Sequence, residues 1–222
     1  MQFLRCVHAE FLLVLPRLPR TRLGFALLAL GVSLVWLHGH GFDALTAILQ
    51  AGALGAIVGA AGVVGHVTDR AALRTILTHP TTPLAIAAGR WLAIVLPAGV
   101  LALGCTVIIG GTVASFWASL IAAAAVGSCA LAIVLPLRSS AAVPLFLFMA
   151  VAGTVAPERL VDLASPGFLR VTAAGALELG PALWHYRYIA IGDAGAVAHG
   201  LAWTGLGVLL AAAFIGRRRA GR

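Results

Sequence analysis

Residues 84–110 read LAIAAGRWLAIVLPAGVLALGCTVIIG, an apolar run that carries one charged side chain, Arg90. A helix that crosses a membrane needs about 20 consecutive, mostly apolar residues, so this run is long enough. Comparable runs cover residues 23–38, 44–66, 114–137, 139–156 and 195–216. Lipid excludes unpaired backbone groups, and the runs lack the period-two alternation of barrel strands. The sequence therefore predicts one all-α membrane domain, residues 1–222, with six transmembrane helices.

The composition excludes most other classes of protein. Charged residues make up 10% of the chain, against about 25% in soluble domains. The net charge of +8 comes from arginine, because the sequence contains no lysine. A nucleic-acid binder typically has a basic face with interleaved aromatic residues; this pattern is missing, which argues against nucleic-acid binding. The cysteines Cys6, Cys105 and Cys129 lie far apart and form no CxxC motif, which favours a packing role.

The arginines predict the orientation of the chain. The loops after the runs 23–38 and 84–110 contain none, whereas the segments on the other side of the predicted membrane contain twelve. Because cytoplasmic loops are enriched in arginine, we expect both termini in the cytoplasm of a bacterial inner-membrane protein. The twelve are Arg5, Arg17, Arg20, Arg22, Arg70, Arg74, Arg90, Arg138, Arg217, Arg218, Arg219 and Arg222.

Two segments are predicted not to span. Residues 1–20 mix polar and apolar side chains before prolines, which indicates an interfacial amphipathic helix. Residues 157–194 are expected to form two short helices on the outer surface, with Asp193 capping the last span. Tryptophan and tyrosine favour the headgroup level, so Trp184, Tyr186 and Tyr188 are candidate contacts of this outer-side segment.

Small residues in the second run allow two interpretations. The glycines that repeat there with small-xxx-small spacing are Gly52, Gly55, Gly59 and Gly62. Such spacing lets helices approach closely in lipid, either between two subunits or within one. Packing within one subunit is the more economical interpretation, and a dimer face is the alternative.

Between the second and third runs, residues 67–83 read VTDRAALRTILTHPTTP. Thr68 and Asp69 can cap a helix, and Pro80 and Pro83 end it. Helical spacing gives this segment an apolar ridge and a basic flank, formed by Leu73, Ile76 and Leu77 and by Arg70 and Arg74. On the cytoplasmic side, such a helix can rest on lipid as a plain interfacial turn, or insert into a cytoplasmic protein.

The run DRAALRTILTHPTTPLAIAAGRW resembles the segment between the second and third spans of ABC-2-type transporter permeases. The features that match are Asp69-Arg70, Leu73, Ile76-Leu77, Pro80 and Gly89-Arg90. The chain departs from the family pattern at Ala71-Ala72, where a glycine is common, and at Asp69, where glutamate is more usual. The predicted interfacial helix, six spans and basic tail extend the resemblance over nearly the whole chain.

The resemblance implies an ATP-driven exporter of a hydrophobic or amphipathic substrate. Two permease subunits, alike or different, would enclose the path, and two ABC ATPase subunits would bind below. The short helix would be the coupling helix that contacts the ATPase, through Asp69, Arg70, Leu73, Arg74, Ile76 and Leu77. The chain has no GxxxxGK[ST] phosphate loop, so we expect no enzymatic activity here and ATP with Mg²⁺ in a partner subunit.

Other functions stay open at this stage. Ser128 and His199 suggest a rhomboid-type intramembrane serine protease, in which a histidine activates a serine. The G-x-S-G motif of that family does not fit, because Val126 and Cys129 stand at its glycine positions. A non-transporting assembly subunit and, within the family, the haem-export permease of cytochrome c maturation are further alternatives. We expect no catalytic group, cofactor or metal in this chain, because its histidines lack a clear carboxylate or thiolate partner. Arg90 lies near the cytoplasmic end of the third run, where its side chain can snorkel to the membrane surface.

Overall fold

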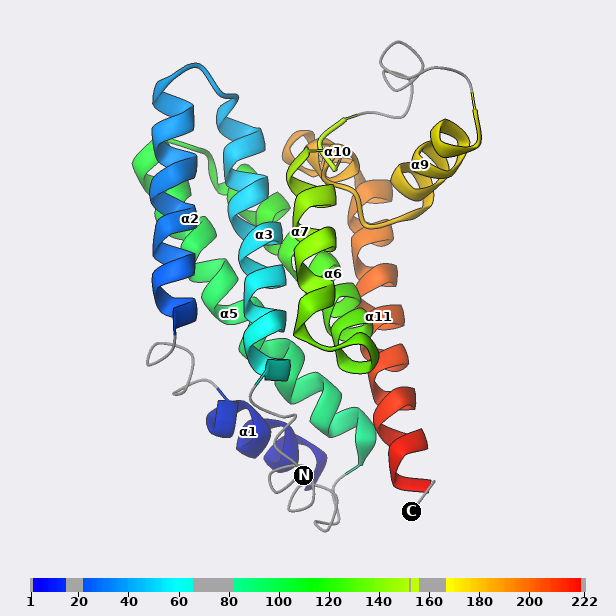
Figure 1. The fold of residues 1–222 in the computed structure, drawn as a ribbon. Helices are drawn as coiled ribbons and strands as arrows, with labels where there is room; N and C mark the ends of the chain where they lie inside the picture. The colour runs from blue at the N-terminus through cyan, green and yellow to red at the C-terminus, as the bar shows by residue number, and fades with distance from the viewer. Residues whose placement is uncertain (1, 15–21, 66–81, 152, 156–166, 221–222) are drawn as a thin grey trace.

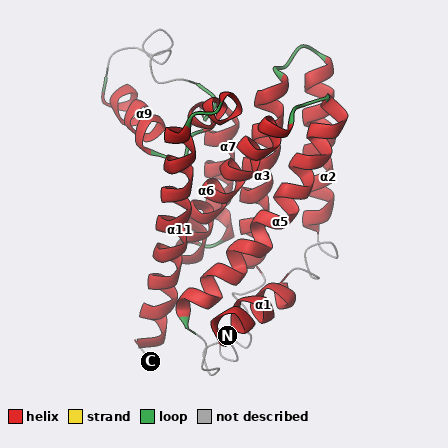
Figure 2. Ribbon diagram, turned by 180° about the vertical axis from the view of Figure 1, so that it is seen from behind, coloured by secondary structure: helices red, strands yellow, loops and turns green. Residues whose placement is uncertain are grey.

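The computed structural model describes residues 2–14, 22–65, 82–151, 153–155 and 167–220. Within these ranges the chain is helical and contains no strand (Figures 1 and 2). The helices are α1 Gln2–Val14, α2 Arg22–Gly39, α3 Ala44–Gly65, α5 Pro83–Ile109, α6 Val113–Leu137, η2 Ser139–Ala141, α7 Ala142–Val151, α9 Phe168–Leu179, α10 Leu183–Tyr186, η3 Arg187–Ile191 and α11 Ala194–Ala220.

Four of the described helices, α3, α5, α6 and α11, are long and apolar enough to cross a membrane. Their bounds agree with the predicted runs to within a few residues. The apolar stretches Leu23–Gly39 and Ser139–Val151 are shorter. The fifth run was predicted over 139–156; its described helical part, η2 followed by α7, ends at Val151. At 1.5 Å per residue it is about 20 Å long, less than the hydrocarbon core of about 30 Å.

Helix α3 forms the centre of the bundle, in contact with α2, α5, α6 and α7. Its glycines Gly52, Gly55 and Gly59 face other helices of the same chain. A methyl group at Gly52 would lie 2.5 Å from the backbone oxygen of Ser119 on α6, and one at Gly55 would lie 3.5 Å from Ala98 on α5. The side chain of Gln50, also on α3, donates to the carbonyl of Ala150 near the end of α7 (3.0 Å). These close approaches confirm the packing interpretation for Gly52 and Gly55.

Local signals set the ends of the long helices. The hydroxyl of Thr82 accepts from Ala85 N (3.3 Å) and caps α5, which begins at a proline. Gly110 ends α5 in the left-handed conformation, with φ of 77°. Asp193 accepts from Gly195 N (2.8 Å) at the start of α11, which confirms the predicted cap.

The bundle has two distinct ends (Figure 1). At the first, which we call the α1 end, lie α1, the end of α3, the start of α5 and the end of α11; a methyl group at Gly216 on α11 would lie 3.7 Å from the Pro83 ring. At the second, the α10 end, lie α10, η3 and the turns that join α2 to α3 and α5 to α6. Both described termini are therefore at the α1 end.

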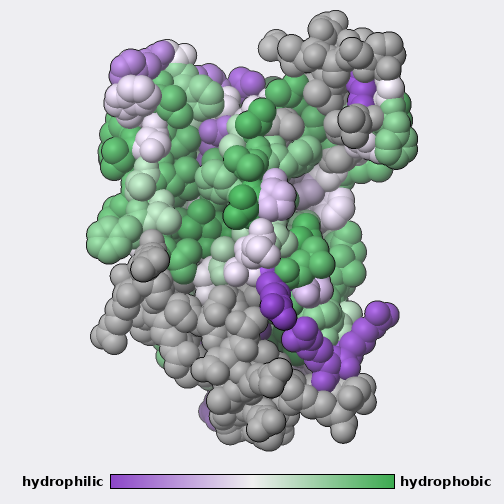
Figure 3. All heavy atoms as spheres, viewed as in Figure 1, coloured by the Kyte–Doolittle hydropathy of each residue, from purple (hydrophilic) through white to green (hydrophobic). Residues whose placement is uncertain are grey.

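The surface between the two ends is apolar. Large apolar side chains are exposed along α2, α5 and α11, among them Phe25, Val32, Val100, Val107 and Leu209. Figure 3 shows hydrophobic residues over the middle of one face, with hydrophilic ones at the α2–α3 turn and near the end of α11. Such a distribution is compatible with an integral membrane protein, because in that class of protein lipid contacts the middle of the molecule and water its ends.

Candidate functional site

The predicted coupling residues lie outside the described part of the chain. Asp69, Arg70, Leu73, Arg74, Ile76 and Leu77 all fall within residues 66–81. The helices on either side of this segment are described: α3 ends at Gly65 and α5 begins at Pro83, both at the α1 end. Of the residues that carry the family resemblance, Gly89 and Arg90 on α5 can be placed.

Arg90 joins α5 to α1 through a buried ion pair. Its Nε donates to the Glu10 carboxylate at 2.9 Å, and the two side chains are 4% and 8% exposed. An arginine hidden this deeply needs a paired, hydrogen-bonded acid, because an isolated charge there would lose its hydration without compensation. The pair is therefore a specific attachment between segments 80 residues apart.

Gly89 makes that attachment possible. A methyl group at this position would come within 2.8 Å of both the Glu10 Cβ and the Val7 carbonyl oxygen. Both atoms belong to α1, so the backbone of α5 touches α1 here without an intervening side chain. The Gly-Arg pair that begins the third apolar run thus has two linked roles, with Gly89 admitting α1 and Arg90 binding it.

Arg90 does not reach the surface as the sequence interpretation expected. Its exposed fraction is 3%, and its hydrogen bond to Glu10 replaces the expected contact with water or headgroups. The prediction of snorkelling is wrong because α1 packs over this part of α5 (Figure 2). The sequence contained one signal for this pair. Glu10 is an acid in the N-terminal segment, and both this segment and Arg90 were predicted at the cytoplasmic side of the membrane.

A second ion pair lies at the α10 end. Arg187 Nη2 on η3 and Asp43 Oδ2 in the α2–α3 turn are 3.3 Å apart, with side chains 45% and 52% exposed. Asp43 also caps α3, accepting from Thr46 N (3.0 Å) and from the Thr46 hydroxyl (2.6 Å). The Thr46 hydroxyl, more than the nearby guanidinium, holds the pKa of Asp43 below its ordinary value.

The three predicted aromatic residues of the outer-side segment occupy different environments. Tyr188 is 44% exposed, as expected for a residue at the headgroup level. Trp184 is half-buried and donates from Nε1 to the Leu177 carbonyl of α9 at 2.7 Å. Tyr186 is fully buried, and its hydroxyl finds no hydrogen-bond partner among the described residues. This ring belongs to the hydrophobic core, where α10 contacts α6 and α11, and burial raises the pKa of Tyr186.

Ser128 and His199 form hydrogen bonds with groups other than each other. The hydroxyl of Ser128 donates to the carbonyls of Ala125 (2.8 Å) and Trp203 (3.1 Å). The Nε2 of His199 accepts from Trp203 Nε1 at 3.1 Å. A protease dyad needs the histidine within hydrogen-bond reach of the serine. Here the serine instead links α6 to α11 at a position where Gly207 packs directly against it.

The polar side chains of the described residues include no group of three histidines, cysteines or carboxylates placed to hold a metal ion. His185 and His199 pack edge to face, with ring centroids 4.5 Å apart, and Trp184 stacks on His185 at 4.4 Å.

Comparisons with family models, with characterised proteins and with solved structures found no match to this chain. A functional assignment must therefore come from the arrangement of its own residues.

Proposed function

We propose that this chain is the permease subunit of an ATP-driven ABC-2-type transporter that exports a hydrophobic or amphipathic substrate. The observation that carries the proposal is which elements lie together at the α1 end. The described ends of α3 and α5 that flank residues 66–81, the amphipathic α1 and the basic tail of α11 all lie there. The two described helix ends that flank residues 66–81 thus lie at the end where a cytoplasmic ATPase would bind.

The buried attachment of α1 gives this arrangement a mechanical consequence. Since Glu10 and Arg90 hold α1 on α5, a force applied to the start of α5 reaches α1 as well. In the proposed mechanism, closure of two ATPase subunits moves the segment containing Arg70 and Arg74, and α5 transmits that movement into the bundle. The chain works with a second permease subunit, identical or homologous, around a shared path.

Six crossings with cytoplasmic termini are part of the proposal. The turn after α7 lies beside α10, because Trp184 N donates to Gly153 O at 3.0 Å. Helix α7 thus runs from the end where α6 finishes to the α10 end, despite its short length (Figure 1). In a bacterial inner membrane, this topology puts the α1 end and its arginines in the cytoplasm.

Charge reversal in the coupling segment tests the proposal. The chain is purified from its native membrane in mild detergent, as wild type, as Arg70→Glu/Arg74→Glu, and as the control Arg217→Glu/Arg218→Glu. The control carries the same charge change at the same end of the bundle, on exposed residues of α11. We expect wild type and control each to co-purify with a phosphate-loop ATPase that hydrolyses ATP. The ATPase and this chain should be present in equal copy number.

The coupling variant should lose that subunit and its hydrolysis while keeping the same monomer stability. Absence of a hydrolysing ATPase from the wild-type preparation would refute the transporter proposal and favour a non-transporting assembly subunit. Retention of the ATPase by the coupling variant would refute the contact through Arg70 and Arg74. Topology is read separately, from reporter fusions at residue 41 and at the C-terminus, which should fall on opposite sides.

A further inference from the structure

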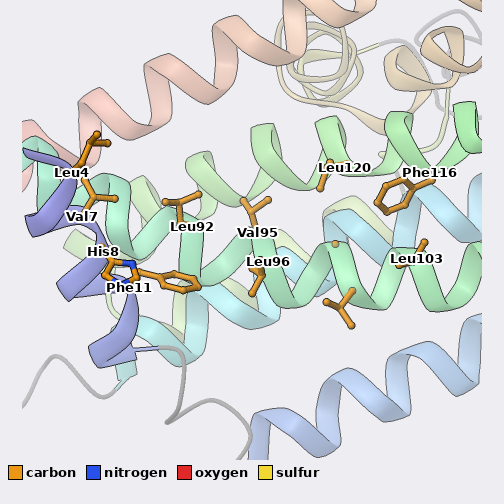
Figure 4. A pocket seen from close by; sticks show the side chains of 12 residues that line it. Leu4, Val7, His8, Phe11, Leu92, Val95, Leu96, Leu103, Phe116 and Leu120 are labelled. Atoms are coloured by element: carbon orange, nitrogen blue, oxygen red, sulfur yellow. The ribbon is translucent and has the colours of Figure 1, made fainter. Parts of the chain in front are cut away.

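An apolar groove of about 510 Å³ runs along the outer side of α5. Its floor is α5 from Leu92 to Leu103; α1 with Phe11 lies at the Leu92 end, and the beginning of α6 with Phe116 lies at the Leu103 end (Figure 4). Every lining residue is apolar except His8, which stands at the α1 end of the groove. This lining suits a hydrocarbon ligand with a polar group at one defined end.

The length of the groove matches one layer of lipid. Leu92 and Leu103 are about 17 Å apart along α5 at 1.5 Å per residue. The hydrocarbon core of a bilayer is about 30 Å thick, so each leaflet contributes about 15 Å. A single acyl chain that enters from the α1 side can therefore fill the groove over its whole length.

The α1 helix carries exposed basic residues at this end of the groove. Arg5 and His8 are exposed and lie three residues apart, on neighbouring positions of the same helix face. The acid of α1, Glu10, is buried and neutralised by Arg90. The exposed surface of α1 beside the groove thus keeps the positive charge of Arg5, which attracts anionic lipid headgroups.

We propose that this groove binds one anionic phospholipid of the leaflet on the α1 side, with an acyl chain along α5 and its phosphate at Arg5 and His8. A second copy of the chain is a poorer occupant, because a two-fold contact here would bring two cationic α1 surfaces together. The proposal requires only that the groove be in contact with lipid, and it is independent of any ATPase partner.

Lipid retention in native mass spectrometry tests the headgroup. The full chain is equilibrated in mixed micelles with equimolar phosphatidylglycerol and phosphatidylcholine that carry the same acyl chains. We expect wild type to retain one phosphatidylglycerol with about five-fold preference, the ratio expected for one basic side chain near the membrane surface. Arg5→Gln should abolish the preference, whereas Arg217→Gln, an exposed arginine at the same end, should keep it.

Filling the groove tests the acyl-chain site. Val100 lines the groove and is 65% exposed, so Val100→Trp can occupy it without disturbing the core. Val107 is 73% exposed on the same helix and is not among the lining residues, so Val107→Trp is the matched control. We expect Val100→Trp to lose the retained lipid of either headgroup and Val107→Trp to keep it.

Three results would overturn the proposal. Equal retention of the two lipids by wild type would exclude selection of an anionic headgroup. Equal lipid retention by Val100→Trp and Val107→Trp would exclude the groove as the binding site. A dimer signal that disappears in Val100→Trp and persists in Val107→Trp would assign the groove to a second copy of the chain.

Discussion

The two ends of the bundle are each held by an arginine–carboxylate pair, but the two pairs differ in burial. At the α1 end, Arg90 and Glu10 are 2.9 Å apart with side chains 4% and 8% exposed. At the α10 end, Arg187 and Asp43 are 3.3 Å apart with side chains 45% and 52% exposed. Both pairs join segments far apart in the sequence, so burial is the main difference between them.

Burial changes what each pair contributes. Loss of one partner from a buried pair leaves an uncompensated charge and costs about 3–5 kcal/mol, although replacing both partners by apolar residues is often neutral. An exposed pair contributes about 0–1 kcal/mol and is weakened by salt. The α1 end is thus sensitive to single substitutions at its pair, whereas the α10 end depends more on its helix cap and its buried aromatic residue.

The largest expected effect is at the buried pair. Glu10→Leu should lower the free energy of unfolding by about 3–5 kcal/mol, since Arg90 is left buried and alone. The double variant Glu10→Leu/Arg90→Leu should recover most of that loss. Unfolding by a denaturing detergent in mixed micelles measures both. A cost below about 1 kcal/mol for Glu10→Leu would mean that Arg90 can reach the membrane surface after all.

Next in size is the close approach that accompanies the pair. Gly89→Ala places a methyl group against the α1 backbone and should cost about 1–3 kcal/mol by overpacking. Gly104→Ala on the same helix is the control, because a methyl group there meets no atom within 4 Å. The control should gain up to about 1 kcal/mol from helix propensity. Equal effects of the two variants in the same unfolding assay would contradict direct contact between α5 and α1.

At the exposed pair, the helix cap should dominate. Asp43→Ala removes the acceptor for Thr46 N and should cost about 1 kcal/mol. Arg187→Gln leaves the cap intact and should cost less than about 0.5 kcal/mol. The same unfolding assay separates them; a larger cost for Arg187→Gln than for Asp43→Ala would show that the ion pair, not the cap, holds this end.

The smallest effects come from pH and salt. The pKa of Asp43 is lowered in the folded chain, so its contribution to stability is present above its ordinary pKa of 3.8 and is lost as the pH falls through the lower, folded value. Added salt should weaken the contribution of Arg187. Comparison of wild type with Asp43→Asn across this acidic range measures the first effect. A parallel pH dependence in the two proteins would exclude Asp43 as its source.

The helices could be predicted from sequence because they depend on local patterns. Apolar run length located α3, α5, α6 and α11, and Asp193 was recognised as a cap from its position alone. The length of α7 was overestimated within the described residues, since apolarity continues past Val151 while the helix does not. Hydropathy indicates whether a residue prefers an apolar environment or water, but it does not indicate where a helix ends.

The contacts between helices were harder to predict because they depend on tertiary structure. Arg90 and Glu10 were each interpreted from their own neighbours, as a snorkelling arginine and a polar residue of an interfacial helix. The sequence does not show that α1 folds back over α5 and buries both. Tyr186 was similarly expected at the headgroup level with its aromatic neighbours, yet it fills the space between α6 and α11. The coupling residues, outside the described ranges, stay a prediction.

The separation of Glu10 and Arg90 along the chain also has a consequence for biosynthesis. Glu10 and Arg90 are 80 residues apart in the sequence, with α2 and α3 between them, so Glu10 leaves the ribosome long before its partner does. Before α5 is present, α1 has no buried cation to pair with its carboxylate, so we expect α1 to stay exposed to water. We therefore expect α1 to dock late, after the third apolar run has been synthesised. A nascent chain truncated before residue 90 should keep α1 accessible to protease.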